Sequence, residues 1–306
     1  MKQPTRLIVN LLILLIFSMN WGWGSVLSMA FAGVAKTESV EQKIDQMGKY
    51  DSFILEGDIR RFAGETLTYD LGFMIFSNAG QAQISFYEEN GQFKCLLVAE
   101  TKGFIGWLTS YVKHIYKASF YIVDGGKKLR TATFEREIIV GNERERIFHA
   151  MDYASLRHHW FVYQNDELIG QFNEPLSENA QLDDVLGAFY NFRNAAYGKI
   201  ETGRSYHIPT FWTKDNQPEK GSEMFIYLPT ESERRNYEEA EGAGKMEGSQ
   251  RLMKVQVPSD LFETENGELY FWASKHLIPL EAIYKDFILF GDLRFRLSKG
   301  TIHRRK

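Results

Sequence analysis

The residue types that most often carry out chemistry in proteins do not form a known catalytic pattern in this chain. It contains no Gly-x-Ser-x-Gly, His-Glu-x-x-His, paired-cysteine or phosphate-loop motif. Gly242-Ala243-Gly244, followed by Lys245 and Gly248, has the wrong spacing for a phosphate loop. We therefore expect no catalytic residue, no cofactor and no metal, and a protein that is not an enzyme. An enzyme would need a site assembled from residues distant in sequence.

Three groups of residues could still do chemistry, and each has a simpler structural explanation. His158 and His159 are adjacent, so on a strand they point to opposite faces and cannot hold one metal together; we expect surface histidines. Asp183 and Asp184 could form an acid pair, but neighbours on a helix point about 100° apart, so capping explains them better. Cys95 lies in an alternating segment, which is typical of a small buried hydrophobic residue.

Most of the elements that must position these residues are predicted to be antiparallel strands. Two-residue turn signals separate the apolar or alternating runs, because tight hairpins need residues that tolerate positive φ. These signals are Asn90-Gly91, Gly125-Gly126, Gly141-Asn142, Asn165-Asp166, Asn266-Gly267 and Gly291-Asp292. Alternation places Leu67, Tyr69, Leu71 and Phe73 on one face of a strand, and Phe93, Cys95, Leu97 and Ala99 on one face of another.

The turn at Gly141-Asn142 also predicts a register. It sets Glu137 opposite Arg146 and Ile139 opposite Arg144, so the alternating charges at 143–146 indicate a solvated strand face. Strands and long helices do not alternate, which disfavours a parallel α/β fold. The sequence predicts a mainly β protein with a strongly curved antiparallel sheet, open or partly closed like a barrel, and one or two packed α-helices.

Two segments have helical periodicity instead. The first apolar stripe is formed by Phe104, Trp107, Leu108, Tyr111, Val112 and Ile115. The second is formed by Leu182, Val185, Leu186 and Phe189, with Asp183 and Asp184 in the first turn, Arg193 near the end and Gly198 after it. Early acids and a late base suit the helix dipole, so we expect an aspartate to cap this helix and Arg193 to pair near its end.

The N-terminus predicts export. Lys2 and Arg6 precede an apolar stretch whose densest part is 7–19, and Ala30-Phe31-Ala32 follows, which is the order of a secretory signal. We expect cleavage after Ala32, with Ala35 as the second choice. An uncleaved anchor is the alternative, because no charge occurs between Arg6 and Lys36.

Composition and charge exclude one class of partner. The 306 residues carry 36 Lys+Arg against 40 Asp+Glu, a net charge of -4, which argues against nucleic acid as a partner.

We expect a signal peptide at 1–32, a lead-in segment at 33–62 and a single β-rich envelope domain at 63–306. A Glu-rich stretch at 231–250 with almost no apolar residues predicts a mobile loop within that domain. The expected location is the periplasm or cell envelope, with at most peripheral membrane association.

Three segments resemble one family. Gly64-Glu65-Thr66-Leu67-Thr68-Tyr69-Asp70-Leu71, followed by Asn78-Ala79-Gly80, resembles the opening of the exported bacterial family called domain of unknown function 3108. The helix at 184–193 resembles its central helix, and Trp272-Ala273-Ser274 with Ile278-Pro279-Leu280 resembles its closing strand pair. This chain has Phe73 near the position of a frequent family Trp, Gly187 for a Ser and Phe192 for a Leu. The resemblance covers roughly 63–297 and implies an exported envelope protein. Its motif residues, which we expect to be structural, are Tyr69, Asp70, Asp183, Asp184, Arg193 and Trp272.

The aromatic content of 23 Phe, 15 Tyr and 6 Trp exceeds the background. A large aromatic core explains it, and so does an apolar cavity in which Phe104, Trp107, Leu108 and Tyr111 bind a lipid or acyl chain. A non-enzymatic module binding an apolar envelope ligand is the first hypothesis, and a scaffold or assembly factor engaging another envelope protein is the second. An open apolar groove would favour the first, and an exposed aromatic patch would favour the second.

Overall fold

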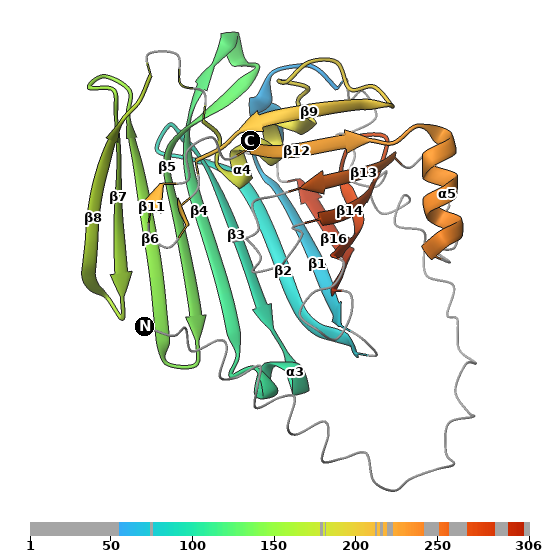
Figure 1. Ribbon diagram of the computed structural model, residues 1–306, viewed down its shortest axis with the longest axis horizontal. Coiled ribbons are helices and arrows are strands. Elements are labelled where there is room, and N and C mark those ends of the chain that lie inside the picture. Colours follow the sequence, from blue (N-terminus) through green and yellow to red (C-terminus); the bar gives the residue numbers. More distant parts are fainter. Residues whose placement is uncertain are drawn as a thin grey trace, which may run out of the picture. The chain divides into compact units, whose positions relative to one another are not determined.

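The chain folds mainly into antiparallel strands (Figure 1). The computed structural model describes residues 55–73, 76–177, 180, 182–211, 213–214, 217–218, 223–241, 251–256, 268–284 and 293–302. The strands are β1 (Glu65–Phe73), β2 (Phe76–Glu89), β3 (Gln92–Thr101), β4 (Val112–Val123), β5 (Lys128–Val140), β6 (Glu143–Asp152), β7 (Arg157–Gln164), β8 (Glu167–Pro175), β9 (Arg204–Pro209), β10 (Thr213–Lys214), β11 (Gln217–Pro218), β12 (Glu223–Leu228), β13 (Arg251–Gln256), β14 (Glu268–Ala273), β15 (Pro279–Tyr284) and β16 (Leu293–Ile302). The helices are η1 (Ile59–Phe62), α3 (Gly103–Leu108), η2 (Asp124–Gly126), α4 (Val185–Arg193) and α5 (Glu231–Glu241).

Fourteen strands form one curved sheet that does not close, which confirms the predicted fold class. Strands β1 to β8 follow one another as neighbours. The chain then passes through α4 to β9 at the opposite edge of the sheet and returns through β12, β13, β14 and β15 to β16, which pairs with β1. Strands β8 and β9 are therefore the two edges, and the small pair β10–β11 stands apart from the sheet.

The predicted turns lie where hairpins need them. Asn90-Gly91 connects β2 to β3 and has positive φ at both residues. At the turn between β5 and β6, Glu137 pairs with Arg146 and Ile139 pairs with Arg144, as expected. Of the other turn signals, Asn266-Gly267 and Gly291-Asp292 lie outside the described residues.

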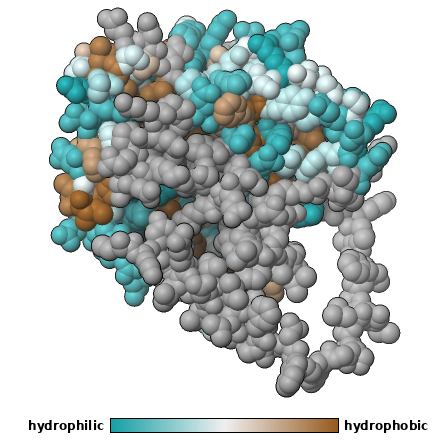
Figure 2. Space-filling view, viewed as in Figure 1, coloured by the Kyte–Doolittle hydropathy of each residue, from teal (hydrophilic) through white to brown (hydrophobic). Residues whose placement is uncertain are grey.

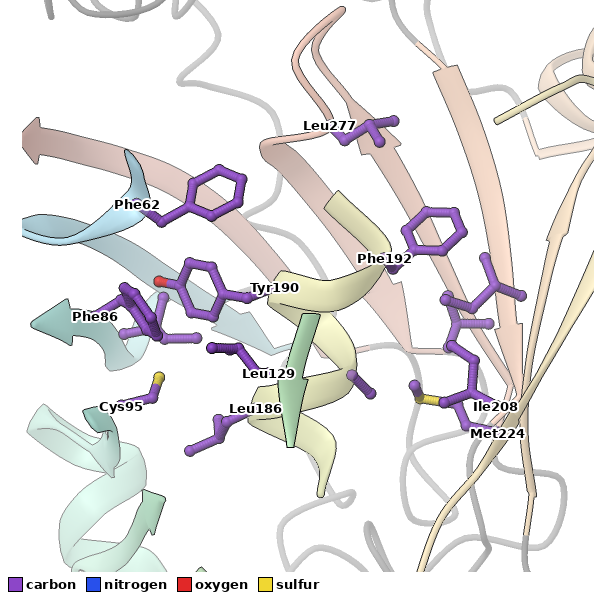
Figure 3. Packing of buried hydrophobic residues seen from close by; sticks show 14 of the residues in the cluster. Phe62, Phe86, Cys95, Leu129, Leu186, Tyr190, Phe192, Ile208, Met224 and Leu277 are labelled. Atoms are coloured by element: carbon purple, nitrogen blue, oxygen red, sulfur yellow. The ribbon is translucent and has the colours of Figure 1, made fainter. Parts of the chain in front are cut away.

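Helix α4 fills the interior of the curved sheet (Figure 3). Tyr190 points to one wall, where its ring centroid lies 4.6 Å from that of Phe86 and 5.4 Å from that of Phe62. Phe192 points the other way, toward Ile208 and Met224 of β9 and β12. The sheet thus encloses a packed aromatic core with the helix at its centre.

The curl of the sheet brings the segment after β9 against strands near the opposite edge. Phe211, just beyond β9, lies with its ring centroid 6.0 Å from Phe134, 5.1 Å from His149 and 5.4 Å from His158, which belong to β5, β6 and β7. These contacts connect the β9 side of the sheet to the strands near β8.

The helix predicted over Phe104 to Ile115 is wrong beyond Leu108. Helix α3 ends there, Ser110 and Tyr111 both have positive φ, and Val112 begins strand β4. Two consecutive left-handed residues cannot continue a right-handed helix. The i, i+3, i+4 spacing of apolar residues was therefore produced by a short helix, a turn and a strand in succession.

The loop predicted at 231–250 is also wrong in its first half, because Glu231–Glu241 form helix α5. Thr230 and Glu233 exchange hydrogen bonds as a capping box, with the Thr230 amide donating to the Glu233 carboxylate over 2.8 Å. Tyr237 of this helix stacks on Tyr270, with ring centroids 4.3 Å apart, and packs against Trp272. The capping box and the packing of Tyr237 thus stabilise a helix in a segment of polar composition. Residues 242–250 lie outside the described part of the chain.

The boundary expected at residue 63 falls too late. Ile59 and Phe62 of η1 are almost fully buried in the core, so the last residues of the expected lead-in at 33–62 belong to the folded domain. The signal segment at 1–32 lies outside the described residues. None of the described helices combines the length and apolar character that crossing a bilayer requires.

Candidate functional site

A buried polar network surrounds both ends of α4. At its start, Asp184 is the N-cap: its Oδ1 accepts hydrogen bonds from the Leu186 amide over 2.8 Å and the Gly187 amide over 3.0 Å. Its Oδ2 accepts a bond from the Thr131 hydroxyl over 2.6 Å, which ties the helix to β5. The carboxylate therefore satisfies helix amides and fixes the helix on the sheet at the same time.

Asp183 belongs to a second set of contacts at the same helix start. The Tyr197 hydroxyl donates to its Oδ2, the Asn191 side chain donates to its Oδ1 over 3.3 Å, and the Lys128 ammonium lies 3.8 Å away. Asn191 also exchanges two hydrogen bonds with the backbone of Leu129, at 2.7 and 2.9 Å. The helix is thus joined to the start of β5 through side chains that are themselves held in place.

Burial raises the pKa of both Asp183 and Asp184 to about 6, since it penalises the charged form. Both residues are at most 2% exposed, and each carboxylate oxygen accepts a hydrogen bond. Carboxyls that titrate near neutral pH are found in active sites and in structural networks alike. Their complete satisfaction by neighbouring donors supports the structural interpretation of this pair.

The end of α4 carries a buried ion pair with β1. Arg193 Nη1 donates to Glu65 Oε1 over 2.6 Å and Nη2 donates to Oε2 over 2.9 Å, and both side chains are at most 1% exposed. The guanidinium carbon lies 4.7 Å from the centre of the Phe62 ring and 5.1 Å from that of Phe189. Two of the three segments that resemble the family, the opening strand and the central helix, therefore meet at this pair.

The other predicted motif residues are divided between this network and distant positions. Tyr69 lies beside the ion pair, where burial raises the pKa of its hydroxyl. Asp70 instead accepts a hydrogen bond from Gln81 on β2 over 3.3 Å. Trp272 lies in a separate cluster with Leu252 and Ile283, under α5. Cys95 is a buried free thiol whose pKa is raised by burial.

The candidate ligand residues form an exposed tip at the end of the sheet. Trp107 is 66% exposed and Tyr111 is 58% exposed. The Tyr111 amide donates to the Gly106 carbonyl over 2.6 Å, and a Cβ on Gly106 would lie 2.8 Å from the Tyr111 ring, so only glycine allows this packing. The side chains of Phe104 and Leu108 lie outside the described part of the chain. Trp107 is therefore not part of the core.

A chain of buried titratable groups lies on the inner face of β6, β7 and β8 and was not foreseen from the sequence. His158 Nδ1 lies 3.0 Å from Glu174 Oε1, and His158 Nε2 lies 2.9 Å from His149 Nδ1. His158 is 1% exposed, so the expected surface position is wrong. The hairpin register places Met151 opposite His158 and His149 opposite Trp160, and this same-face alternation was the available signal. Glu174 lies opposite His158 on the neighbouring strand β8, where a register shift between Val162 and Tyr163 moves the pairing by one residue. Phe211 comes from the segment after β9 and could not be paired with His158 from the sequence.

This histidine pair makes the stability depend on pH. Burial lowers the pKa of His149 and of His158 below the ordinary value of 6.5, so the unfolded chain binds protons more readily than the folded chain. The stabilisation is present above about pH 6.5 and is lost as the pH falls. Asp183 and Asp184 act in the opposite sense, because their raised pKa values stabilise the fold as the pH falls below about 6.

We therefore expect His149→Phe to make the free energy of unfolding depend less steeply on pH below about pH 6.5. Urea unfolding between about pH 5 and 8 would measure it, because the variant lacks the proton uptake of the buried imidazole on unfolding. Arg136 and His159 also act on this pair, so each of them should be kept in the variant. Equal slopes for the variant and the wild type would contradict the assignment.

Comparison of the fold with solved structures finds a distant similarity in backbone course. No family model matches the chain, and no curated protein matches it. A crystal structure of a beta-barrel-like protein of domain of unknown function DUF1849 from Brucella abortus is similar, with a TM-score of 0.43 and 9% sequence identity over 80% of this chain and 99% of that one. That domain is a different one from domain of unknown function 3108.

Proposed function

We propose that the protein is an exported envelope protein without enzymatic activity, which binds lipid at a membrane surface through the exposed tip formed by Trp107 and Tyr111. The exposure of these two aromatic side chains at one end of the sheet is the observation that carries the proposal. The charged start, apolar stretch and Ala-x-Ala order of the leader, together with the resemblance to an exported family, support the envelope location.

The packing of the protein interior favours a lipid contact on the surface. Helix α4 and the aromatic side chains around Tyr190 fill the inside of the curved sheet, so an acyl chain held against α3 meets an exposed tip and not a lid. Trp and Tyr have an apolar body and a polar group, which favours them where hydrocarbon meets water. We therefore expect the lipid at the exposed surface of the tip and not in a cavity beneath α3.

An exposed aromatic patch is also expected of a scaffold that binds another protein. The size and the charge of the tip favour lipid over a protein partner. A specific protein interface buries about 800 Å² on each partner, far more than two side chains supply. Lys102 and Lys113 flank the tip and both contact Glu100, at 3.7 and 3.8 Å, which leaves an excess of positive charge. A small aromatic tip with excess positive charge suits an anionic lipid surface.

Sedimentation with phosphatidylglycerol vesicles would test the proposal. The full mature chain should bind, and Trp107→Ser with Tyr111→Ser should weaken binding roughly tenfold or more, because burying one such side chain contributes about 1.5–3 kcal/mol. Leu168→Ser with Ile169→Ser is the matched control, since it removes two other exposed apolar side chains. Equal binding by the wild type and the tip variant would overturn the proposal.

The edge strand β8 supports a second candidate, a scaffold that pairs with a strand of another envelope protein. Leu168 is 49% exposed and Ile169 is 57% exposed, and among the described strands β8 pairs with β7 alone. Figure 2 shows hydrophobic surface on the side where Figure 1 draws β8. An edge of this kind is a template for an added strand. In a cross-linking experiment on native envelopes, Leu168→Ser with Ile169→Ser should lose the partner while the tip variant keeps it.

A further inference from the structure

A depression of about 490 Å³ lies where the end of β4, the start of β5 and the chain after β6 meet. Its lining includes Tyr121, Arg130, Met151, Asp152 and Tyr153. The volume is within the range of small-molecule sites, roughly 300–1,000 Å³. Trp107 and Tyr111 precede the first residues of β4, and Tyr121 is near its last residues, so the depression and the lipid-binding tip are at opposite ends of that strand.

Arg130 supplies a positively charged group to this depression. Its guanidinium carbon lies 3.3 Å from the centre of the Tyr153 ring, and its Nε is buried without a hydrogen-bond partner. Asp152 is the one acid among the described lining residues, and its oxygens accept bonds from the Ala154 amide, the Ser155 amide and the Ser155 hydroxyl. The Asp152 carboxylate, which could neutralise Arg130, therefore already accepts hydrogen bonds from Ala154 and Ser155 in the turn that follows it.

Aromatic rings orient the guanidinium and provide an apolar surface beside it. The Tyr153 hydroxyl donates to the Thr131 carbonyl over 2.7 Å, which fixes the ring under Arg130. Tyr121 is 53% exposed, and its ring stands steeply inclined to that of Tyr153, with centroids 6.2 Å apart and an interplanar angle of 73°. Met151 is buried and adds a flexible apolar contact.

We propose that this depression binds a small organic anion with an apolar body, whose carboxylate or phosphate oxygens accept hydrogen bonds from Arg130 while the body packs on Tyr121. A planar guanidinium stacked on an aromatic ring is already oriented to bind such oxygens. The apolar body adds affinity through burial against the tyrosine ring. Either a free amphiphile or the head group of an anionic lipid provides this chemistry.

Calorimetric titration of the full mature chain with decanoate, decanol and acetate tests the proposal. Decanoate should bind most tightly, because it alone has both the anionic group and the apolar body. Arg130→Gln should weaken decanoate binding about tenfold or more, as expected for loss of a charge-assisted hydrogen bond. Tyr121→Ala should weaken decanoate binding and leave the weak binding of acetate unchanged. Arg157→Gln is the matched control, because this exposed arginine lies on β7 and bonds Asn173.

Vesicle binding by the same variants distinguishes a free amphiphile from a bilayer lipid, and the depression at Arg130 from the tip at Trp107 and Tyr111. Loss of both decanoate and phosphatidylglycerol vesicle binding in Arg130→Gln would support the site and assign its ligand to bilayer lipid, whereas retained vesicle binding would support a free amphiphile. The tip variant at Trp107 and Tyr111 should keep decanoate binding, so failure of the proposed function leaves this result standing. Equal affinity for decanoate and decanol, or equal loss in Arg130→Gln and Arg157→Gln, would overturn the inference.

Discussion

Replacing Arg193 by methionine should lower the free energy of unfolding by about 3–5 kcal/mol. The substitution leaves the Glu65 carboxylate buried without the two hydrogen bonds that it receives from the guanidinium at 2.6 and 2.9 Å. The side chain of Glu65 is 0% exposed, so water cannot replace the lost donors. An uncompensated buried charge is among the most destabilising changes a single substitution can make.

Urea unfolding at neutral pH would measure this loss, and two further variants would identify its cause. Glu65→Leu combined with Arg193→Met should recover much of the stability, because it removes both charges at once. Arg234→Met is the matched control, since Arg234 contacts Glu231 on the surface of α5 at 2.7 Å and its loss should matter far less. A double variant as unstable as the sum of both single variants would contradict the pairing.

Replacing Phe211 by alanine should cost about 3–5 kcal/mol through the cavity that it leaves. Phe211 is 6% exposed and packs against Phe134, His149 and His158, so its loss removes these contacts between the β9 side of the sheet and β5 to β7. Amide hydrogen exchange should accelerate in β9 and β12 as well as in β6 and β7, because the cavity lies between them.

Phe172→Ala provides the comparison for this second result. The Phe172 ring stacks on that of Trp160, with centroids 5.2 Å apart, and packs against a cluster formed by residues of β6 and β7. The same deletion should therefore accelerate exchange in β6, β7 and β8 and leave β9 unchanged. If both variants accelerate exchange in β9 equally, Phe211 does not connect the two sides of the sheet.

Local features of the fold were predictable from the sequence. The turn at Gly141-Asn142 set its register correctly because a two-residue hairpin fixes which residues face each other. The capping role of Asp184 followed from its position before an apolar stripe. Helix α3 was overextended because Ser110 and Tyr111 adopt positive φ without being glycine, and no local signal indicates that.

Features that depend on distant residues were not predictable. Glu65 and Arg193 are 128 positions apart, and nothing in either segment names the other as its partner. His158 looked like a surface residue because Phe211, which packs against it, comes from the segment after β9, and because a register shift between β7 and β8 brings Glu174 opposite it. For the same reason the depression at Arg130 could not be foreseen, because Tyr121, Arg130 and Tyr153 meet only when three strands pair.

The position of β16 beside β1 determines the order in which the sheet can be completed. A hydrogen bond between Ser298 and Thr68 joins residues 230 positions apart, whereas successive strands from β1 to β8 are joined by connections of at most ten residues. Closing so long a loop adds little equilibrium cost, on the order of 0.6 kcal/mol for each doubling of its length, but contacts between distant residues slow folding. Until β16 arrives, a partly folded chain carries an open edge along β1, in the middle of the future sheet, where another chain can pair and begin aggregation.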